Sequence, residues 1–219
     1  MSLKTFFSEQ ARNPSGLFGR VVMSAIFDRG NSIINGLMEE KLAVNENERI
    51  LEIGFGTGKL ICKIAKRLTG GTIEGIDLSP TMVAIAQKRN LKHIKEGKVI
   101  VRQGDFGEAE YRESSFDKIC SANTIYFWSN PVNYIDKIYR ILKPGGDLIL
   151  AFEDKAQLEM RSLSKNVFKF YSLDEIGNLL SHNGFPGSIK YASREKESQI
   201  FHCVVATKMP SRSERGNHE

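Results

Sequence analysis

Three glycines at alternate positions, Gly54, Gly56 and Gly58, form the stretch of this sequence best suited to hold a ligand. Residues 49–53 before them are short and mostly apolar, as a buried parallel strand should be. Glycine lets the chain turn sharply and approach a bound group without a Cβ in the way. Apolar residues at helical spacing follow from Lys59. A helix N-terminus therefore points at the turn, where it can hold a carboxylate, a phosphate or a polar group.

The spacing of these glycines separates the turn from the common nucleotide-binding motifs. A dinucleotide fingerprint reads G-x-G-x-x-G or A, and its third position falls on Lys59. The G-K-[ST] ending of a P-loop is also missing from this stretch. Glu52 precedes the glycines, so the pattern reads acid-x-Gly-x-Gly-x-Gly. The alternative is a tight strand-to-helix turn that holds no ligand.

A second acid follows at the distance that ribose recognition requires. Residues 72–77 are predicted as the next strand, which ends on Asp77, about twenty residues beyond the glycine turn. A carboxylate at that point can accept hydrogen bonds from both ribose hydroxyls. Asp77 can instead cap the next helix, as can Ser79 followed by Pro80. The strand, the turn and the acid in register favour the ribose role.

Length, composition and charge predict one ordinary globular domain. The chain has 219 residues, of which 41% are hydrophobic and 26% charged. No run of eighteen apolar residues and no secretory signal is found, so we expect a cytoplasmic protein with no membrane span. The net charge is +5, but basic and acidic residues are interleaved, without a block of five like charges. This pattern favours a solvated surface over a nucleic-acid groove.

Cysteine and histidine usage predicts no metal site. Cys62, Cys120 and Cys203 lie far apart, each among apolar neighbours, which is typical of buried free thiols. The four histidines show no ligand spacing, and the sequence contains no C-x-x-C.

The pattern from Glu52 to Gly58 resembles the first motif of the class I S-adenosylmethionine-dependent methyltransferases. Three later patterns, in the family's order, are similar as well: residues 75–82 around Asp77, the Gly104-Asp105 pair, and the Leu-Lys-Pro-Gly-Gly turn at 142–146. The resemblance covers about residues 45–153. It is greatest to the small-molecule methyltransferases that include the ubiquinone- and menaquinone-biosynthesis C-methyltransferases.

This resemblance implies an α/β fold: a Rossmann-like, doubly wound, seven-stranded and mostly parallel sheet with a C-terminal antiparallel hairpin. We expect an N-terminal helical cap in residues 1–45, the S-adenosylmethionine-binding domain in 46–208, and a disordered tail in 209–219. Apolar spacing predicts helices at 17–27 and 32–42. These helices either pack against the sheet edge or close the ligand cleft.

The resemblance also implies S-adenosylmethionine as cofactor and S-adenosylhomocysteine as product. Asp77 then receives the ribose, Leu78 and Met82 pack on the adenosine, and Asp105 with the backbone of Phe106 receives the adenine. An Asx-turn is the alternative role for Asp105. The full set of residues expected around the donor is Glu52, Gly54, Phe55, Gly56, Gly58, Asp77, Leu78, Met82, Gly104, Asp105, Phe106, Asn123 and Ile125.

The substrate is expected beside an aromatic run. Tyr126, Phe127 and Trp128 follow the predicted strand 116–123 at its carboxyl end, where open α/β sheets bind ligands. Packing in the core is an equal alternative for them. The run lacks the prolines found at this point in enzymes that methylate base amines, which argues against such a substrate. Phe18 and Arg20 are the further substrate-lining candidates, and Phe6 and Phe7 can line an apolar pocket with Phe18.

The implied chemistry is an in-line displacement at the sulfonium methyl, in which the protein supplies proximity, alignment and water exclusion. A base can assist if the acceptor is a phenol or an activated carbon, and Tyr126, Glu153 and Asp154 are candidates for this role. We therefore expect a methyltransferase, monomeric or homodimeric, that acts on a small apolar or aromatic metabolite. The alternatives are a nucleic-acid or protein methyltransferase and a donor-binding protein without transfer activity.

Overall fold

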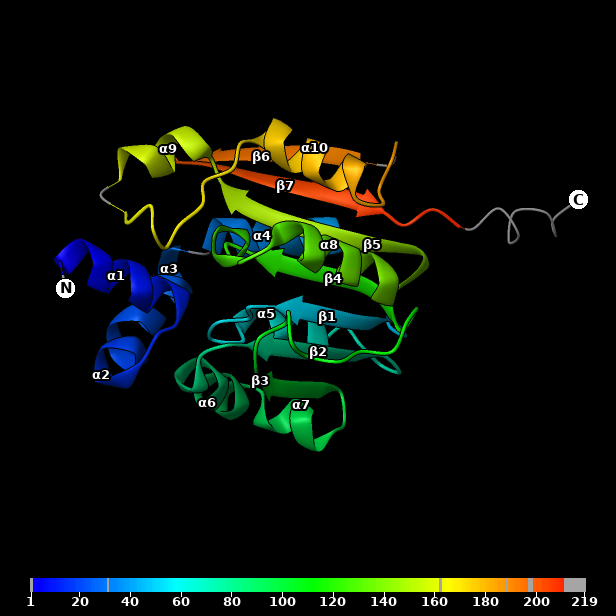
Figure 1. The fold of residues 1–219 in the computed structure, drawn as a ribbon. Coiled ribbons are helices and arrows are strands. Elements are labelled where there is room, and N and C mark those ends of the chain that lie inside the picture. The colour runs from blue at the N-terminus through cyan, green and yellow to red at the C-terminus, as the bar shows by residue number, and fades with distance from the viewer. Residues whose placement is uncertain (1, 31, 162, 188, 197–198, 211–219) are drawn as a thin grey trace, which may run out of the picture.

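Seven strands form one sheet in the order β3-β2-β1-β4-β5-β7-β6 (Figure 1). The computed structural model describes residues 2–30, 32–161, 163–187, 189–196 and 199–210. The strands are β1 (Arg49–Ile53), β2 (Thr72–Asp77), β3 (Val99–Gln103), β4 (Phe116–Ala122), β5 (Leu142–Glu153), β6 (Ile189–Lys196) and β7 (Gln199–Thr207). β1 to β5 are parallel, and β7 is antiparallel to both β5 and β6. The predicted Rossmann-like architecture, with its C-terminal hairpin, is confirmed.

Both faces of the sheet are buried, which explains why β1 is apolar along most of its length. Ile50 packs into one core cluster, and Leu51 and Ile53 pack into the other, because successive side chains of a strand point to opposite faces. The first face is covered by α4 (Ser32–Leu42), α5 (Lys59–Ala65), α6 (Pro80–Arg89) and α7 (Leu91–Lys95). The second face is covered by α8 (Pro131–Ile141) and α10 (Leu173–His182).

Residues 81–94 have helical spacing that predicts one helix, but the structure forms two helices there, because Asn90 ends α6. The Asn90 side-chain amide donates to the carbonyl of Ala86 at 2.9 Å and to that of Gly58 at 3.1 Å. α7 then begins at Leu91. Side-chain amides that bind nearby carbonyls compete with helix continuation, and here the same amide also joins α6 to the glycine turn.

The N-terminal segment divides into two parts with different positions. α4 packs on the sheet through buried apolar side chains, whereas the helices before it lie beyond the carboxyl ends of the parallel strands (Figure 1). These are α1 (Leu3–Arg12), α2 (Gly16–Phe18), a π-helical turn (Gly19–Met23) and α3 (Ser24–Gly30). Ser79 donates to the carbonyl of Pro14, which fixes this cap to the end of β2. The sequence did not predict α1, and residues 211–219 of the expected tail lie outside the described residues.

In the described part of the chain, no helix has both the length and the apolar character needed to cross a membrane.

Gly58, at the N-terminus of α5, packs closely against α6 and provides a test of this packing. Its φ is +68°, and an added Cβ would lie 2.7 Å from the Cβ of Ala86. Gly97 has a similar φ of +73°, but nothing lies within 4 Å of its added Cβ. We expect Gly97→Ala to cost about 1 kcal/mol of unfolding free energy from backbone strain alone. Gly58→Ala should cost about 3 kcal/mol, because the clash adds to that strain. Urea unfolding of both variants measures the difference, and equal losses would contradict the packing role.

Candidate functional site

A cavity of about 430 Å³ lies at the carboxyl ends of the parallel strands, beneath the N-terminal cap. Its floor comes from the ends of β1, β2 and β4, and its roof from α1 and α3. Open α/β sheets bind ligands at this edge, where the strand order reverses between β1 and β4.

The glycine turn presents its backbone to this cavity. Gly54 has a φ of +71°, and a Cβ there would lie 2.3 Å from Thr124 Cγ2. Gly56 has a φ of +55°, and the nearest atom to its added Cβ is Phe27 Cδ2, at 3.6 Å. The first glycine is therefore required by close packing. A Cβ at the second would be in ordinary van der Waals contact with the ring of Phe27, so this glycine lies where the floor of the cavity meets the cap.

Asp77 is held at the cavity floor by two backbone groups. Gly56 N–H donates to Asp77 Oδ2 at 2.8 Å, and Ser79 N–H donates to Oδ1 at 2.9 Å. Burial raises the pKa of Asp77 to about 6, against the effect of these two hydrogen bonds. Ser79 caps α6, since its hydroxyl accepts from Met82 N–H at 3.2 Å. The capping role considered for Asp77 thus belongs to Ser79.

Glu52 brings an unpaired carboxylate oxygen to the same cavity. The residue is 4% exposed, and its Oε2 has no hydrogen-bond partner among the described residues. Burial, and then the charge of Asp77, raise the pKa of Glu52 to about 8. A buried acid in this condition fits a ligand that carries positive charge, because such a ligand compensates the ionised form.

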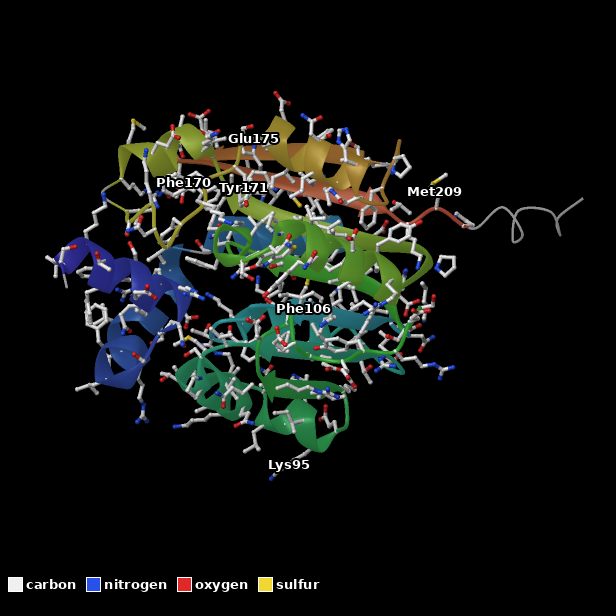
Figure 2. All side chains as sticks on the ribbon, in the orientation of Figure 1. Lys95, Phe106, Phe170, Tyr171, Glu175 and Met209 are labelled. Atoms are coloured by element: carbon white, nitrogen blue, oxygen red, sulfur yellow. The ribbon has the colours of Figure 1, made fainter. Side chains whose placement is uncertain are left out.

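The third strand ends in an Asx-turn beside an aromatic wall. Asp105 Oδ1 accepts from Gly107 N–H at 2.7 Å and from the hydroxyl of Tyr134. Tyr134 stacks on Trp128, with ring centroids 5.0 Å apart. Phe106 is buried in the interior (Figure 2). The Asx-turn considered for Asp105 is therefore present, and the same residue lines the cavity.

Comparisons with known proteins assign this arrangement to a family. Residues 51–150 match the family described as "Methyltransferase domain". An uncharacterised methyltransferase of Bacillus subtilis, YdaC, is 30% identical over 125 residues, which are 57% of this chain and 67% of that protein. The chain belongs to the class I S-adenosylmethionine-dependent methyltransferases. The predicted family and its cofactor are thereby confirmed.

Two further likenesses place this methyltransferase among its relatives. Demethylmenaquinone methyltransferase of Tropheryma whipplei is 30% identical over 142 residues. The match covers 61% of this chain but 56% of that protein, so the chain spans little more than half of its length. Phosphoethanolamine N-methyltransferase 2 of Haemonchus contortus, solved with S-adenosyl-L-methionine, has the same fold with a TM-score of 0.74 at 19% identity. That likeness covers 94% of this chain and 60% of the other.

Most of the residues predicted for the site come together around the cavity. Those that line it are Glu52, Gly54, Phe55, Gly56, Asp77, Leu78, Met82, Gly104, Asp105, Phe106, Asn123, Tyr126, Phe127, Trp128 and Glu153. Gly58 and Ile125 lie behind this lining, in the packing against α6 and in the core. Phe18 packs edge-to-face on Phe6 and Phe7 instead. Arg20 is exposed and is not among the residues that line the cavity.

The structure separates the three candidate bases. Tyr126, in the short helix η2 (Ile125–Phe127), donates to Asn123 Oδ1 at 3.1 Å and accepts from Glu153 N–H at 2.6 Å. Burial raises the pKa of Tyr126 far above its ordinary value, and the phenol bridges the ends of β4 and β5. Asp154 caps α9 (Lys155–Met160) and pairs with His202 Nε2 at 3.1 Å. Glu153 remains, with its carboxylate in the cavity wall and paired with Arg161.

Sequence reasoning missed several cavity residues because they lie in segments without a motif. The segment after β5 looked polar and irregular, yet it contains α9 and contributes side chains to the wall. The cap contributes further side chains, which lie on the face of α3 that points into the cavity. The residues that were not predicted include Met23, Ile26, Phe27, Leu158, Arg161, Leu163 and Phe168. Apolar spacing in the segment after β5 was the available signal.

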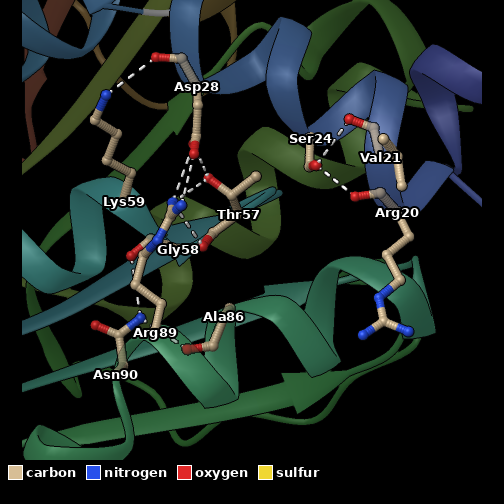
Figure 3. Close-up of polar contacts among 10 residues, drawn as sticks. All are labelled: Arg20, Val21, Ser24, Asp28, Thr57, Gly58, Lys59, Ala86, Arg89 and Asn90. Atoms are coloured by element: carbon tan, nitrogen blue, oxygen red, sulfur yellow. Dashed lines mark hydrogen bonds and ion pairs between the residues drawn. The ribbon is translucent and has the colours of Figure 1, made fainter.

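One ion-pair network fixes the cap to the glycine turn (Figure 3). The Arg89 guanidinium contacts both carboxylate oxygens of Asp28, at 2.6 and 3.0 Å, and Thr57 donates to Asp28 Oδ1 at 2.6 Å. Lys59 donates to the carbonyl of Asp28 at 3.0 Å. The Arg89 guanidinium holds the pKa of Asp28 below its ordinary value. Since Asp28 lies on α3, these contacts close the roof of the cavity onto its floor.

Removing this network should loosen the cap without loosening the sheet. We expect Arg89→Ala to speed amide hydrogen exchange in residues 24–29 by about fivefold, since partly exposed ion pairs contribute up to about 1 kcal/mol. Exchange in β1 should not change. Arg140→Ala is the matched control, because Arg140 pairs with Glu113 at 3.8 Å and is far from the cap in the chain. Equal exchange in α3 of the wild type and Arg89→Ala would contradict this account.

Proposed function

We propose that this methyltransferase binds S-adenosylmethionine over Glu52, Asp77 and Asp105 and transfers its methyl group to a small apolar or aromatic metabolite. The observation that carries the proposal is the composition of the cavity. Acids and glycine backbone line the part at the strand ends, and aromatic and aliphatic side chains line the part under the cap. A donor and an acceptor of different polarity would therefore share one enclosure.

The residues at the strand ends fit the chemical groups of the donor. S-adenosylmethionine carries an ammonium and a sulfonium, and the unpaired Glu52 oxygen supplies the charge that either one needs. The Asp77 carboxylate can accept from a ribose diol while keeping its two backbone donors. Gly56 lines the cavity and has no Cβ to separate its backbone from a ligand. Leu78 and Met82 offer apolar contact to the adenosine.

The residues under the cap support an apolar or aromatic acceptor. Phe127 and Phe168 meet edge-to-face with ring centroids 4.7 Å apart, and Leu158 and Leu163 lie in the same wall. Aromatic side chains provide large contact area with preferred ring geometries, so they suit a flat substrate. Demethylmenaquinone methyltransferase, by its name, acts on a quinone precursor, which agrees with such an acceptor.

The chain itself would contribute alignment, water exclusion and one base. When bound, S-adenosylmethionine supplies a methyl group on a positively charged sulfur. The cap, held by Arg89 and Asp28, keeps water from the methyl path. Burial raises the pKa of the Glu153 carboxyl, although the Arg161 guanidinium opposes it. Glu153 is then placed to accept a proton from an acceptor hydroxyl or activated carbon.

The test is transfer of label from methyl-labelled S-adenosylmethionine to an extract of the host. The full chain is incubated with the extract, and the label is partitioned between organic, small polar and precipitated fractions. Label in the organic or small polar fraction supports the proposal, and Asp77→Ala should lose it. Label in precipitated macromolecules would indicate a nucleic-acid or protein acceptor. Donor binding without transfer would favour a donor-binding protein.

A further inference from the structure

The cap carries an unusual share of exposed apolar side chains. Six of the twelve large hydrophobic residues that are exposed in the described chain lie between positions 3 and 26. Leu17 is 77% exposed and Leu3 72%, and Val21 is 57% exposed. The six are Leu3, Phe7, Leu17, Val21, Val22 and Ile26. Exposed apolar residues gathered in this way mark an interaction site rather than an ordinary solvated surface.

The charged residues exposed on the same segment are all basic. Lys4, Arg12, Arg20 and Arg29 are exposed among residues 2–29. The two acids of this segment are partly buried, and one of them, Asp28, already pairs with Arg89. We call the six apolar and four basic side chains the cap surface. Apolar residues interspersed with lysine and arginine are typical of helices that lie in a membrane interface.

The cap surface is continuous with the cavity. Phe7 and Ile26 belong to the cap surface and also line the cavity. Arg12 also lines the cavity and belongs to the cap surface. Ser164 N–H donates to Ser8 Oγ at 2.9 Å, which joins α1 to the segment after α9. An apolar molecule can therefore pass between the cap surface and the cavity along side chains of matching polarity.

We propose that the cap surface docks on an anionic lipid membrane and that the methyl acceptor is an amphiphile taken from that membrane. The charges decide between a bilayer and a second copy of the chain. In a symmetric dimer the same patch meets itself, so four cations would face four cations without an exposed acid from residues 2–29 to pair with them. Anionic headgroups supply the missing negative charge, and the acyl region accepts the apolar side chains.

The statement about the acceptor rests on the proposed function, whereas the docking does not. Docking needs neither donor nor acceptor, so it is measured on the protein with vesicles alone. Donor binding is measured separately by calorimetry. Failure to dock on vesicles and failure to bind the donor are therefore separate results, so the docking proposal and the proposed function can be overturned independently.

The test is co-sedimentation of the full chain with phosphatidylcholine vesicles that do or do not contain phosphatidylglycerol. We expect binding to the anionic vesicles, weakened by salt because the charges are exposed. The double variant Leu17→Ser, Val21→Ser should weaken binding by about tenfold, since it removes buried apolar area. Arg20→Glu should weaken it by about tenfold, since it reverses one charge. Leu17, Val21 and Arg20 do not line the cavity.

Matched controls sit on α7, far along the chain from the cap. Leu91→Ser removes an apolar residue that is 52% exposed, and Lys92→Glu reverses an exposed charge. Both should bind vesicles as the wild type does, and circular dichroism should show all variants folded. No binding by the wild type, equal binding to neutral and anionic vesicles, or equal losses in the controls would overturn the proposal. So would a dimer in solution that the double variant dissociates.

Discussion

Replacing Asp77 with alanine is expected to weaken binding of S-adenosylhomocysteine by at least about 100-fold. A carboxylate that accepts from two ribose hydroxyls makes two charge-assisted hydrogen bonds, each contributing roughly 1.5–3 kcal/mol. Asp77 is prepared for this role, because Gly56 N–H and Ser79 N–H fix its two oxygens in the cavity floor. Isothermal titration calorimetry measures the loss. Asp77→Asn should fall between the wild type and alanine, since the amide retains one acceptor.

The control for Asp77→Ala is a carboxylate that also accepts from the backbone but lies at the other end of the sheet. Asp117 accepts from Arg49 N–H at 2.8 Å and pairs with Lys143, at the start of β4. Asp117→Ala should lower thermal stability without changing affinity for the donor product. Unchanged affinity in Asp77→Ala would refute the ribose assignment. So would equal losses in the two variants.

The fold was largely predictable from local patterns. Residues 49–53 and 72–77 are strands with the predicted bounds, because buried parallel strands are apolar runs bounded by glycines and acids. The start of α10 also has a local signal, because Ser172 and Glu175 form a capping box there. What these segments share is a signal within a few residues of the feature that it specifies.

The helix break at Asn90 is a feature that local sequence signals did not predict. Residues 81–94 have continuous helical spacing, so the pattern predicts one helix. The break depends on the contact between the Asn90 amide and the Gly58 carbonyl, which come from different elements. A tertiary contact of this kind has no local signature. The Arg89 contact with Asp28 is of the same type, since 61 positions separate the two residues.

The candidate site likewise has one part that local sequence patterns predict and one part that they do not. The donor half lies on turns directly after strands, where the glycine and acid patterns are diagnostic. The half proposed to hold the acceptor is lined largely by cap helices and by residues 155–168, which share no motif and meet only in the folded chain. Of the residues expected around the acceptor, Phe18 and Arg20 do not line the cavity, whereas Tyr126, Phe127 and Trp128 do. Phe27 and Phe168 line it as well, although the sequence did not predict them. Apolar spacing predicts a helix and its buried face, but it does not predict which neighbour covers that face.

Glu52→Gln should remove most of the pH dependence of donor binding. Burial raises the pKa of Glu52 to about 8 in the donor-free protein, so the carboxyl is mostly protonated at pH 7. A cationic ligand favours the ionised form, and binding then releases a proton. Affinity for S-adenosylmethionine should therefore rise between pH 6 and 8 with a slope approaching about tenfold per pH unit. Above the pKa the curve should level off.

The difference between the wild type and Glu52→Gln isolates this carboxyl, because the ammonium of the ligand titrates equally with both proteins. At pH 8 the variant should bind about 10- to 100-fold more weakly, since a neutral amide replaces a charged partner. The same substitution should raise the stability of the donor-free protein at pH 8, although it weakens donor binding. An acid whose pKa is raised by folding lowers stability as pH increases from its ordinary value toward 8. Glu52→Gln lacks that loss, so its melting temperature should exceed that of the wild type at pH 8 and match it near pH 5. Parallel affinity curves for the two proteins would show that Glu52 does not face the charge of the donor.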